Sequence, residues 1–203
     1  MVEAALVLPS MVLLLLGAIQ LTQIQEARIV ADSAAFAAAR AGIVMNGDPA
    51  KMREAATLAL VPAFGRADSV TAMAKSLLRF KAEEAALAPL GLEPLRIDVH
   101  NPVAADFRSF GRHLDGKELD FDDVRPAAAE ATLLSLQLRY LYELRVPFAN
   151  KAIQGIWMAA RREARDDAFG LAAAARAGRY YLPLNAFYTM RMQSNPYLKW
   201  ARP

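Results

Sequence analysis

The hydrophobic positions of this chain begin with one long uncharged run. Residues 4–19 read AALVLPSMVLLLLGAI and would place apolar side chains on every face of a helix. Such a helix is about 24 Å long at about 1.5 Å per residue. This is slightly short of the ~30 Å hydrocarbon core of a bilayer, and Gln20, Leu21 and Thr22 could extend it at modest cost. The pattern therefore indicates a segment suited to lipid.

Three interpretations of this segment compete. A cleaved secretory signal would carry positive charge before the apolar run and a small-residue cleavage site after it, whereas Glu3 is negative and the residues after the run are bulky. A buried core helix is the second interpretation, although a run that is apolar on every face is unusual for a small domain. We favour the third, a helix that sits in the membrane and then continues into water.

Residues 20–46 predict that the helix continues beyond the apolar run. Alanine, the strongest helix former, dominates this segment, which has no proline and a single glycine. Small residues at three- and four-residue spacings line one face, where they let another backbone approach closely. These residues are Ala27, Ala31, Ala34, Ala35, Ala38, Ala41 and Gly42. Asn46-Gly47-Asp48-Pro49 provides a stop signal, and we expect Pro9 to kink or locally melt the helix.

The next part of the chain predicts two helices, one strand and a loop. Residues 49–60 and about 69–87 have helical composition and end at proline- or glycine-containing segments. From residue 95 to 99, apolar and polar residues alternate, which is typical of a strand. Residues 101–127 are polar and mixed in sign, and we interpret them as an irregular loop.

Two long alternating segments predict the main strands. Residues 133–146 place leucine, tyrosine and valine on one face and polar residues on the other, with Leu141 as the exception. Residues 179–194 alternate in the same way, and Pro183 marks this strand as an edge or a bulge. Alternation of this length indicates antiparallel strands with one buried face.

The remaining segments complete an α+β fold. Residues 150–177 are helix-rich, and we interpret the charge run Arg161–Asp167 within them as a solvated turn. We expect the tail from residue 195 to become ordered on contact with a neighbour. The pattern as a whole predicts a long protruding N-terminal hydrophobic helix packed on a small antiparallel sheet with additional helices.

This pattern divides the chain into two parts. Residues 1–46 form the N-terminal helix, of which about 4–22 is the membrane or filament-core part. Residues 47–203 form a globular α+β domain, which is long enough to bury a core.

Composition and charge narrow the function classes. The 203 residues carry 24 basic and 21 acidic side chains, and no dense basic stripe accompanies the net charge of +3, so we expect no specific nucleic-acid partner. The absence of cysteine excludes disulfides, thiolate metal sites and cysteine nucleophiles, and His100 and His113 do not form a zinc pattern. No nucleophile elbow, phosphate loop or spaced carboxylate pair is present. We therefore expect no catalytic site, no cofactor and no bound metal.

Glu3 is the chemically informative residue of the apolar segment. A carboxylate at the edge of a bilayer segment is costly unless it is paired. Either Glu3 lies at the membrane surface near the positive end of the helix dipole, or it becomes buried on assembly and pairs with a cation of a neighbouring subunit. The physical chemistry supports both readings equally.

The N-terminus resembles a known family. The stretch from Met1 to Pro9, MVEAALVLP, followed by LLLLG ending at Gly17, resembles the start of TadE-like pilins of the tight-adherence (Tad/Flp) pilus systems, relatives of type IV pilins. In that family a prepilin peptidase cuts after a leader that ends in glycine, and glutamate is the fifth mature residue. Glu3 and Pro9 match the family's glutamate and proline. Because the glutamate is third here, we interpret the chain as beginning two residues inside the mature N-terminus.

The resemblance implies a function in pilus assembly. It implies a pilin or minor pilin that is anchored in the bacterial inner membrane and then buried by its first helix in a filament at the cell surface or in the periplasm. The implied partners are copies of the chain or other pilins, the inner membrane, the pilus assembly machinery and the prepilin peptidase. The alternative is an envelope or filament-tip protein that initiates assembly or mediates adhesion. The residues that we assign to assembly are Glu3, Pro9, Gly17, Ala27, Ala31, Ala34 and Ala38.

Overall fold

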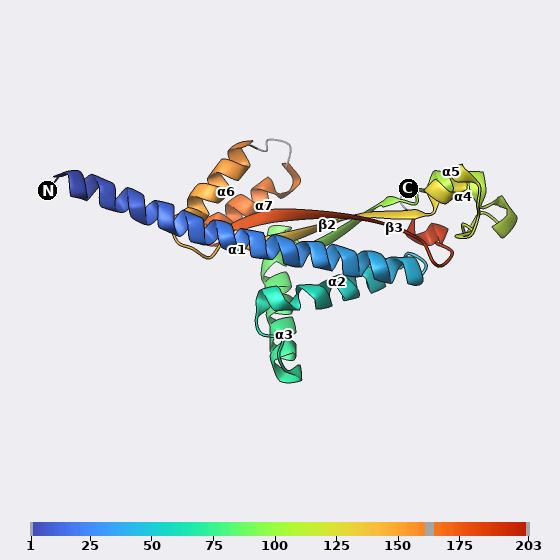
Figure 1. The fold of residues 1–203 in the computed structure, drawn as a ribbon, viewed down its shortest axis with the longest axis horizontal. Coiled ribbons are helices and arrows are strands. Elements are labelled where there is room, and N and C mark those ends of the chain that lie inside the picture. Colours follow the sequence, from blue (N-terminus) through green and yellow to red (C-terminus); the bar gives the residue numbers. More distant parts are fainter. Residues whose placement is uncertain (1, 161–164, 202–203) are drawn as a thin grey trace.

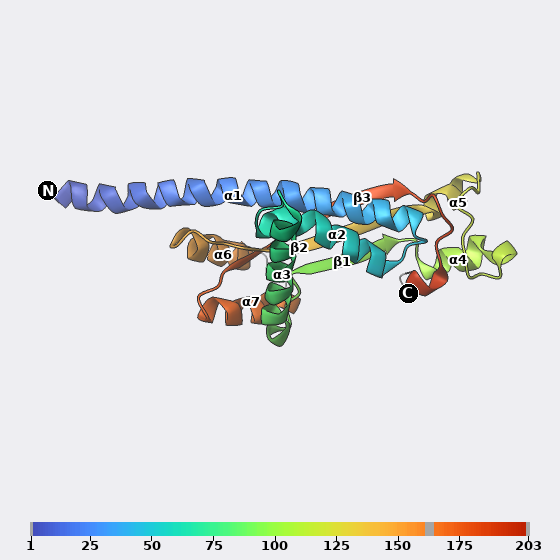
Figure 2. The same cartoon turned by 90° about the horizontal axis from the view of Figure 1, so that it is seen from below.

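A single long helix lies along a three-stranded antiparallel sheet and projects beyond it (Figure 1). The computed structural model describes residues 2–160 and 165–201, with side chains over residues 7–160 and 167–201. The long helix, α1, spans Val2–Val44, and the other elements pack along one side of its C-terminal half (Figure 2). The predicted α+β class, with a protruding helix packed on a small sheet, is confirmed.

Helix α1 runs without a break through Pro9. The proline removes one main-chain hydrogen bond, and the helix accommodates this loss. The local melting that we expected is therefore wrong. The helix ends close to the predicted stop, because Asn46 and Gly47 adopt the left-handed backbone conformation and Gly47 N donates to the Gly42 carbonyl at 2.9 Å.

Helices α2 and α3 follow, each with a side-chain cap. Helix α2, Pro49–Phe64, is capped by Asp48, whose Oδ1 accepts from the Ala50 N–H at 2.8 Å. It continues through Pro62, so it is longer than the sequence pattern predicted. Helix α3, Val70–Leu87, is capped by the hydroxyl of Ser69 and ends in the 3-10 turn η1, Ala88–Leu90.

Arg53 ties α2 to both α3 and the sheet. Its Nη1 donates to the Leu95 carbonyl of the first strand at 2.7 Å, and its Nη2 pairs with Glu84 of α3. Lys81 also binds Glu84 at 2.8 Å. Hydrogen bonds from Lys81 first, and then from Arg53, lower the pKa of Glu84. This carboxylate therefore stays ionised where α3 crosses α2.

The sheet has the strand order β1-β2-β3, with both pairs antiparallel. Strand β1 spans Leu95–Asn101, β2 spans Leu133–Glu143, and β3 spans Tyr181–Arg191. Pro183 lies on the edge strand β3 opposite Leu141 of β2, so an edge position accommodates the residue that cannot donate a ladder hydrogen bond. All three predicted strands are present.

The segment predicted as an irregular loop contains short helices instead. Helix α4 spans Ala104–Phe110, the 3-10 turn η2 spans Arg112–Leu114, and helix α5 spans Pro126–Ala131. Phe107 is fully buried and anchors α4. These helices have few turns and one buried aromatic residue, so the sequence of this polar segment shows no helical period. The prediction of a loop over residues 101–127 is therefore wrong where the helices form.

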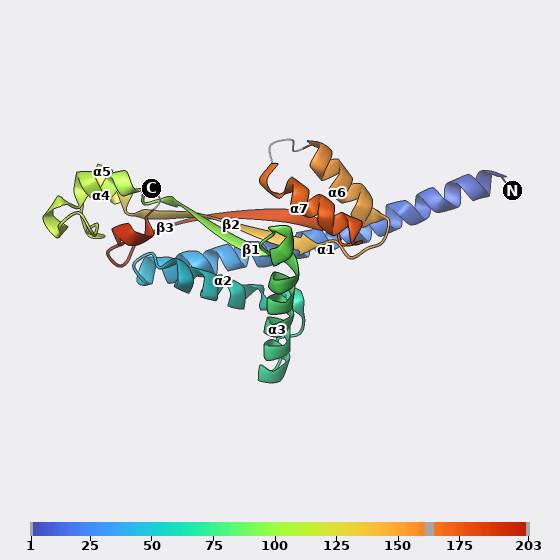
Figure 3. The same cartoon turned by 180° about the vertical axis from the view of Figure 1, so that it is seen from behind.

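Helices α6 and α7 cover the end of the sheet nearest the protruding half of α1 (Figure 3). Helix α6 spans Ala149–Ala160 and α7 spans Arg165–Arg176. Under them lies a second apolar cluster formed by Leu87, Leu92, Leu141, Leu171, Ala174 and Tyr181. This cluster explains why Leu141 breaks the alternation of β2, since that end of the strand is covered on both faces.

The charge run between α6 and α7 is not simply a solvated turn. Asp167 is 7% exposed, and its carboxylate pairs with both Nη atoms of Arg139 on β2. Residues 161–164 and the side chains of Arg165 and Asp166 lie outside the described residues. The interpretation of a solvated turn is therefore wrong for Asp167, because the fold places a strand arginine beside it.

The C-terminal tail packs against its own chain. The Tyr197 N–H donates to the Asn46 carbonyl at 3.2 Å, and the Leu198 N–H donates to the Lys117 carbonyl at 2.8 Å. The 3-10 turn η3, Leu198–Trp200, follows. The expectation that the tail needs a neighbour to become ordered is wrong up to Ala201, since these main-chain bonds hold it within the domain.

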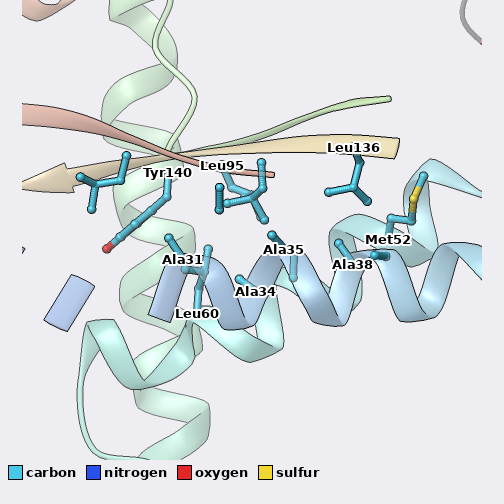
Figure 4. Packing of buried hydrophobic residues seen from close by; sticks show 14 of the residues in the cluster. Ala31, Ala34, Ala35, Ala38, Met52, Leu60, Leu95, Leu136 and Tyr140 are labelled. Carbon is cyan, nitrogen blue, oxygen red and sulfur yellow. The ribbon is translucent and has the colours of Figure 1, made fainter. Parts of the chain in front are cut away.

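The main core forms where the alanine-rich face of α1 meets the sheet and α2 (Figure 4). Ala34 and Ala38 have no exposed surface, and the side chains that face this part of the helix come from β1, β2 and α2. The labelled partners are Leu95, Leu136, Tyr140, Met52 and Leu60. A Cβ on Gly42 would lie 2.6 Å from Leu134 Cδ2 and 2.7 Å from Met52 Sδ, so a side chain at this position would force these neighbours to move.

We expect Ala34→Leu to lower the free energy of unfolding by about 1–3 kcal/mol, because overpacking forces the helix away from the sheet. The measurement is urea unfolding of the full chain in a mild detergent, followed by circular dichroism. Ser33→Leu is the matched control, since the neighbouring Ser33 is exposed. Equal stability of the two variants would contradict this account of the core.

We expect Asp167→Ala to lower the free energy of unfolding by up to about 3 kcal/mol, because it leaves the poorly exposed Arg139 without a counter-charge. The double variant Arg139→Met/Asp167→Leu should recover most of this loss, since it removes both charges. Amide hydrogen exchange of α7 and thermal unfolding measure the effect. A double variant as unstable as the single one would show that the ion pair is not the cause.

Candidate functional site in helix α1

The protruding half of α1 exposes a continuous apolar surface. Eight large side chains are between 44% and 74% exposed over this segment, Leu16 is half-buried, and Gln20 is the first fully buried residue among the described side chains. The exposed large residues are Val7, Leu8, Met11, Val12, Leu13, Leu14, Leu15 and Ile19. Described residues outside α1 leave this surface open, so it must be covered by something other than its own chain.

The physical chemistry of this surface requires an apolar environment. Burying a large apolar side chain contributes about 1.5–3 kcal/mol, and a continuous patch of this kind marks a membrane or protein contact. Residues Val7–Val44 form a helix that is long and apolar enough to cross a membrane. Because the domain covers its C-terminal half, the segment left for lipid or for other helices is the N-terminal one.

Gln20 marks the point where α1 enters the domain. Its Oε1 accepts the Val146 N–H at 2.8 Å in a fully buried site. This bond joins the helix to the loop between β2 and α6. We predicted that Gln20 extends the lipid segment, and the structure instead makes it the first anchor of the domain. Its signal in the sequence is weak, because it is one uncharged polar residue at the end of an apolar run.

The structure separates the predicted assembly residues into two groups. Pro9 and Gly17 lie on the protruding segment, and no atom lies within 4 Å of a Cβ built on Gly17. The backbone of Glu3 lies in the same helix, but its side chain falls outside those that the structure describes. Ala27, Ala31, Ala34 and Ala38 form the second group and are buried against their own sheet and α2.

A second exposed stripe runs along the domain half of α1. Exposed residues recur at helical spacing along one side of the helix: Gln25, Ile29, Asp32, Phe36 and Arg40. Ile29 is 69% exposed, and the ring of Phe36 contacts Tyr188 of β3 edge-on with centroids 5.2 Å apart. The sequence pattern did not reveal this stripe, since the alanines dominate it.

A cavity of about 450 Å³ lies between α3 and the end of β2, and it is lined by charged groups. Arg179 bridges Glu83 at 2.6 Å and Glu143 at 2.9 Å, and the Tyr181 hydroxyl donates to Glu83 at 2.5 Å. Burial first, and then this hydrogen bond, raise the pKa of Tyr181. The groups pair with one another and hold α3 to the sheet, so they form a structural network rather than a nucleophile beside a base.

The described part of the chain contains no cluster of three or more metal-ligand side chains. Among these residues, no group of three histidine, aspartate or glutamate side chains could hold an ion.

We expect Gln20→Ala to lower the free energy of unfolding by about 1–3 kcal/mol, because it leaves the buried Val146 N–H without an acceptor. Gln25→Ala is the control, since Gln25 is exposed on the same helix, and it should change stability by less than about 0.5 kcal/mol. Urea unfolding of the full chain in detergent compares the two. Similar losses in both variants would argue against an anchoring role for Gln20.

The comparisons with known proteins identify the same region. Residues 1–40 match the family model described as TadE-like protein, and this stretch includes both the exposed apolar segment and most of the alanine face. No curated protein matches the chain, and no solved structure does. A TadE-like N-terminus with an exposed apolar helix suggests a membrane-anchored protein associated with Tad pili. The N-terminal 40 residues of the chain therefore match the TadE-like protein family.

Proposed function

We propose that this chain is a structural subunit, a pilin or minor pilin, of a Tad-type pilus. The N-terminal half of α1 anchors it in the inner membrane and is then buried among other helices in the filament core. The observation that carries this proposal is the exposed apolar segment from Val7 to Ile19, which projects from a folded domain and lies within the TadE-like region. No specific nucleic acid, cofactor or catalytic step is part of the proposal.

The protruding segment suits both environments. Lipid chains and neighbouring apolar helices both cover it, so transfer between them depends on close packing rather than on the hydrophobic effect. Gly17 supports such packing, because its face is open to a neighbouring backbone. Head-to-tail contacts of this kind do not close into a ring and therefore build a filament.

In this proposal, the alanines contribute to assembly by fixing the arrangement of the domain and α1. Ala27, Ala31, Ala34 and Ala38 hold the domain at one angle to α1, which gives every subunit the same shape. The exposed stripe that contains Ile29 then continues the contact surface beyond the filament core. Pro9 lies in the protruding half, where a missing main-chain donor leaves one carbonyl open to a neighbouring group.

Glu3 sets the register of the filament in this proposal. A charge buried without a partner is strongly unfavourable, so assembly must bring a cation of a neighbouring subunit to it. The pilus assembly machinery and the prepilin peptidase, which the family resemblance implies, act before this step. The assembled chain lies at the cell surface or in the periplasm.

The alternative is a membrane-anchored envelope or filament-tip protein. One observation favours it: α3 and α6 project from α1 in opposite directions and make the domain wide relative to the helix that carries it (Figure 1). A wide domain limits how closely many copies of α1 can approach one another. Such a protein would initiate assembly or mediate adhesion without forming the bulk polymer.

We expect Glu3→Ala to reduce the yield of filaments while the domain stays folded, because the variant lacks the charge that pairs between subunits. Glu26→Ala is the control, since Glu26 is exposed on the domain half of the same helix. Electron microscopy of sheared filaments measures the yield, and circular dichroism of the purified variant measures folding. Wild-type filament yield from Glu3→Ala would sink the pairing role. Detergent-soluble monomers without filaments, from the unaltered chain, would favour the tip or envelope protein.

A further inference from the structure

We propose that the domain rests on the lipid surface through a juxtamembrane patch at the end from which α1 emerges. The patch consists of Arg145, Pro147, Phe148, Lys151, Ala152 and Ile156, in the loop before α6 and on α6 itself. The inference rests on the proposed anchoring of α1 in the membrane, and it adds a second contact with lipid that the anchoring does not require.

The apolar residues of this patch are unusually exposed. Phe148 is 72% exposed and Ile156 is 70% exposed, and Ala152 lies exposed between them at a spacing of four residues. Ala152 and Ile156 share one face of α6, and Phe148 lies directly before the first residue of this helix. Exposed apolar side chains on one face of a surface helix, next to an exposed aromatic residue, suit a membrane interface.

This face of α6 points away from the rest of the domain. On the opposite side, Gln154 is buried and its Nε2 donates to the Leu171 carbonyl of α7 at 3.4 Å. Trp157 packs against the apolar cluster beneath α7. Figures 1 and 3 show α7 on the side of α6 that is farther from the N-terminus. The face with Ala152 and Ile156 is therefore turned towards the end of the domain where α1 protrudes.

The length of the protruding helix brings this end of the domain to the bilayer surface. Glu3 marks the far limit of the apolar segment, and Gln20 is held in the domain by Val146. The 17 residues from one to the other span about 26 Å, which is less than the ~30 Å hydrocarbon core. When Glu3 reaches the far interface, Val146 and the neighbouring Phe148 are drawn down to the headgroups.

The backbone around Phe148 is held so that its side chain stays exposed. Phe148 has φ 66°, in the left-handed region that is rare for an aromatic residue. Two hydrogen bonds from backbone N–H groups fix the loop on either side: Gln20 Oε1 accepts the Val146 N–H at 2.8 Å, and the Val146 carbonyl accepts the Asn150 N–H at 3.0 Å. A strained residue that keeps a large apolar side chain in solvent points to a contact made outside the chain.

The charges of the patch fit an anionic lipid surface. Arg145 and Lys151 are exposed on either side of Phe148. Glu143, the carboxylate two residues before Arg145, is bound to Arg179 at 2.9 Å and contributes little negative charge to the patch. Basic residues beside an apolar face strengthen binding to anionic headgroups. The occupant is therefore a bilayer that contains anionic phospholipid.

The chain has no cysteine, so a single introduced cysteine reports one position without ambiguity. We would place an environment-sensitive fluorophore at Phe148→Cys, Ile156→Cys, Leu14→Cys or Val124→Cys in the full chain, reconstituted in phosphatidylethanolamine–phosphatidylglycerol vesicles. Leu14 lies in the protruding helix and tests anchoring. Val124 is 86% exposed and directly precedes α5 at the opposite end of the molecule, so it is the matched control (Figure 1).

Lipids brominated near the headgroup should quench the labels at positions 148 and 156, and those brominated deep in the acyl chains should quench the label at position 14. The label at position 124 should keep its fluorescence. The charge substitutions Arg145→Gln and Lys151→Gln together, or vesicles without phosphatidylglycerol, should reduce quenching at positions 148 and 156 and leave position 14 unchanged.

The outcomes separate the two proposals. Quenching at position 14 without quenching at 148 and 156 overturns the juxtamembrane patch and leaves the anchoring intact. Absence of quenching at all positions overturns the anchoring and, with it, the patch. Equal quenching at positions 148 and 124 indicates non-specific adsorption of the domain and also overturns the patch.

Discussion

The close approach between α1 and the sheet is the contact on which the rest of the molecule depends. Ala34, Ala38 and Gly42 have little or no side chain, so the helix axis lies near enough to the sheet for leucines of β2 to pack against its backbone. Helix α2 completes the same layer through Met52 and Leu60. Larger residues on this face would separate the helix from the domain, and the projecting half of α1 would lose its defined direction.

Beyond that contact, the molecule has two parts. One is the folded domain, and the other is a rod, the protruding half of α1, whose surface is compatible with lipid. Gln20 lies at the boundary, where a buried hydrogen bond to Val146 replaces the apolar exposure of the preceding turns. Ion pairs attach the outlying helices to this body: Arg53 binds Glu84 of α3, and Arg139 binds Asp167 of α7. The described residues of the domain do not cover the projecting rod, so lipid or other helices must cover it.

The two proposals share a physical basis, because both depend on the length of the rod that precedes the domain. In the proposed arrangement, a rod slightly shorter than the hydrocarbon core holds its domain against the membrane. Extraction into a filament would then have to release both the rod and the apolar face of α6. The TadE-like match covers the rod and most of its attachment, and it ends before the globular elements that carry α6.

The sequence by itself determined the elements with a strong local period. It predicted the apolar run, the alanine face of α1, and the alternation over β2 and β3, because each repeats a pattern over many residues. It also limited Pro183 to an edge or a bulge, since proline cannot donate to a strand ladder, and the structure places it on the edge strand. Only the tertiary structure decided which surface covers the alanines, that Gln20 binds a residue 126 positions away, and that Asp167 faces Arg139. These partners meet through contacts distant in sequence, and a local pattern of apolar and polar residues carries no information about such contacts.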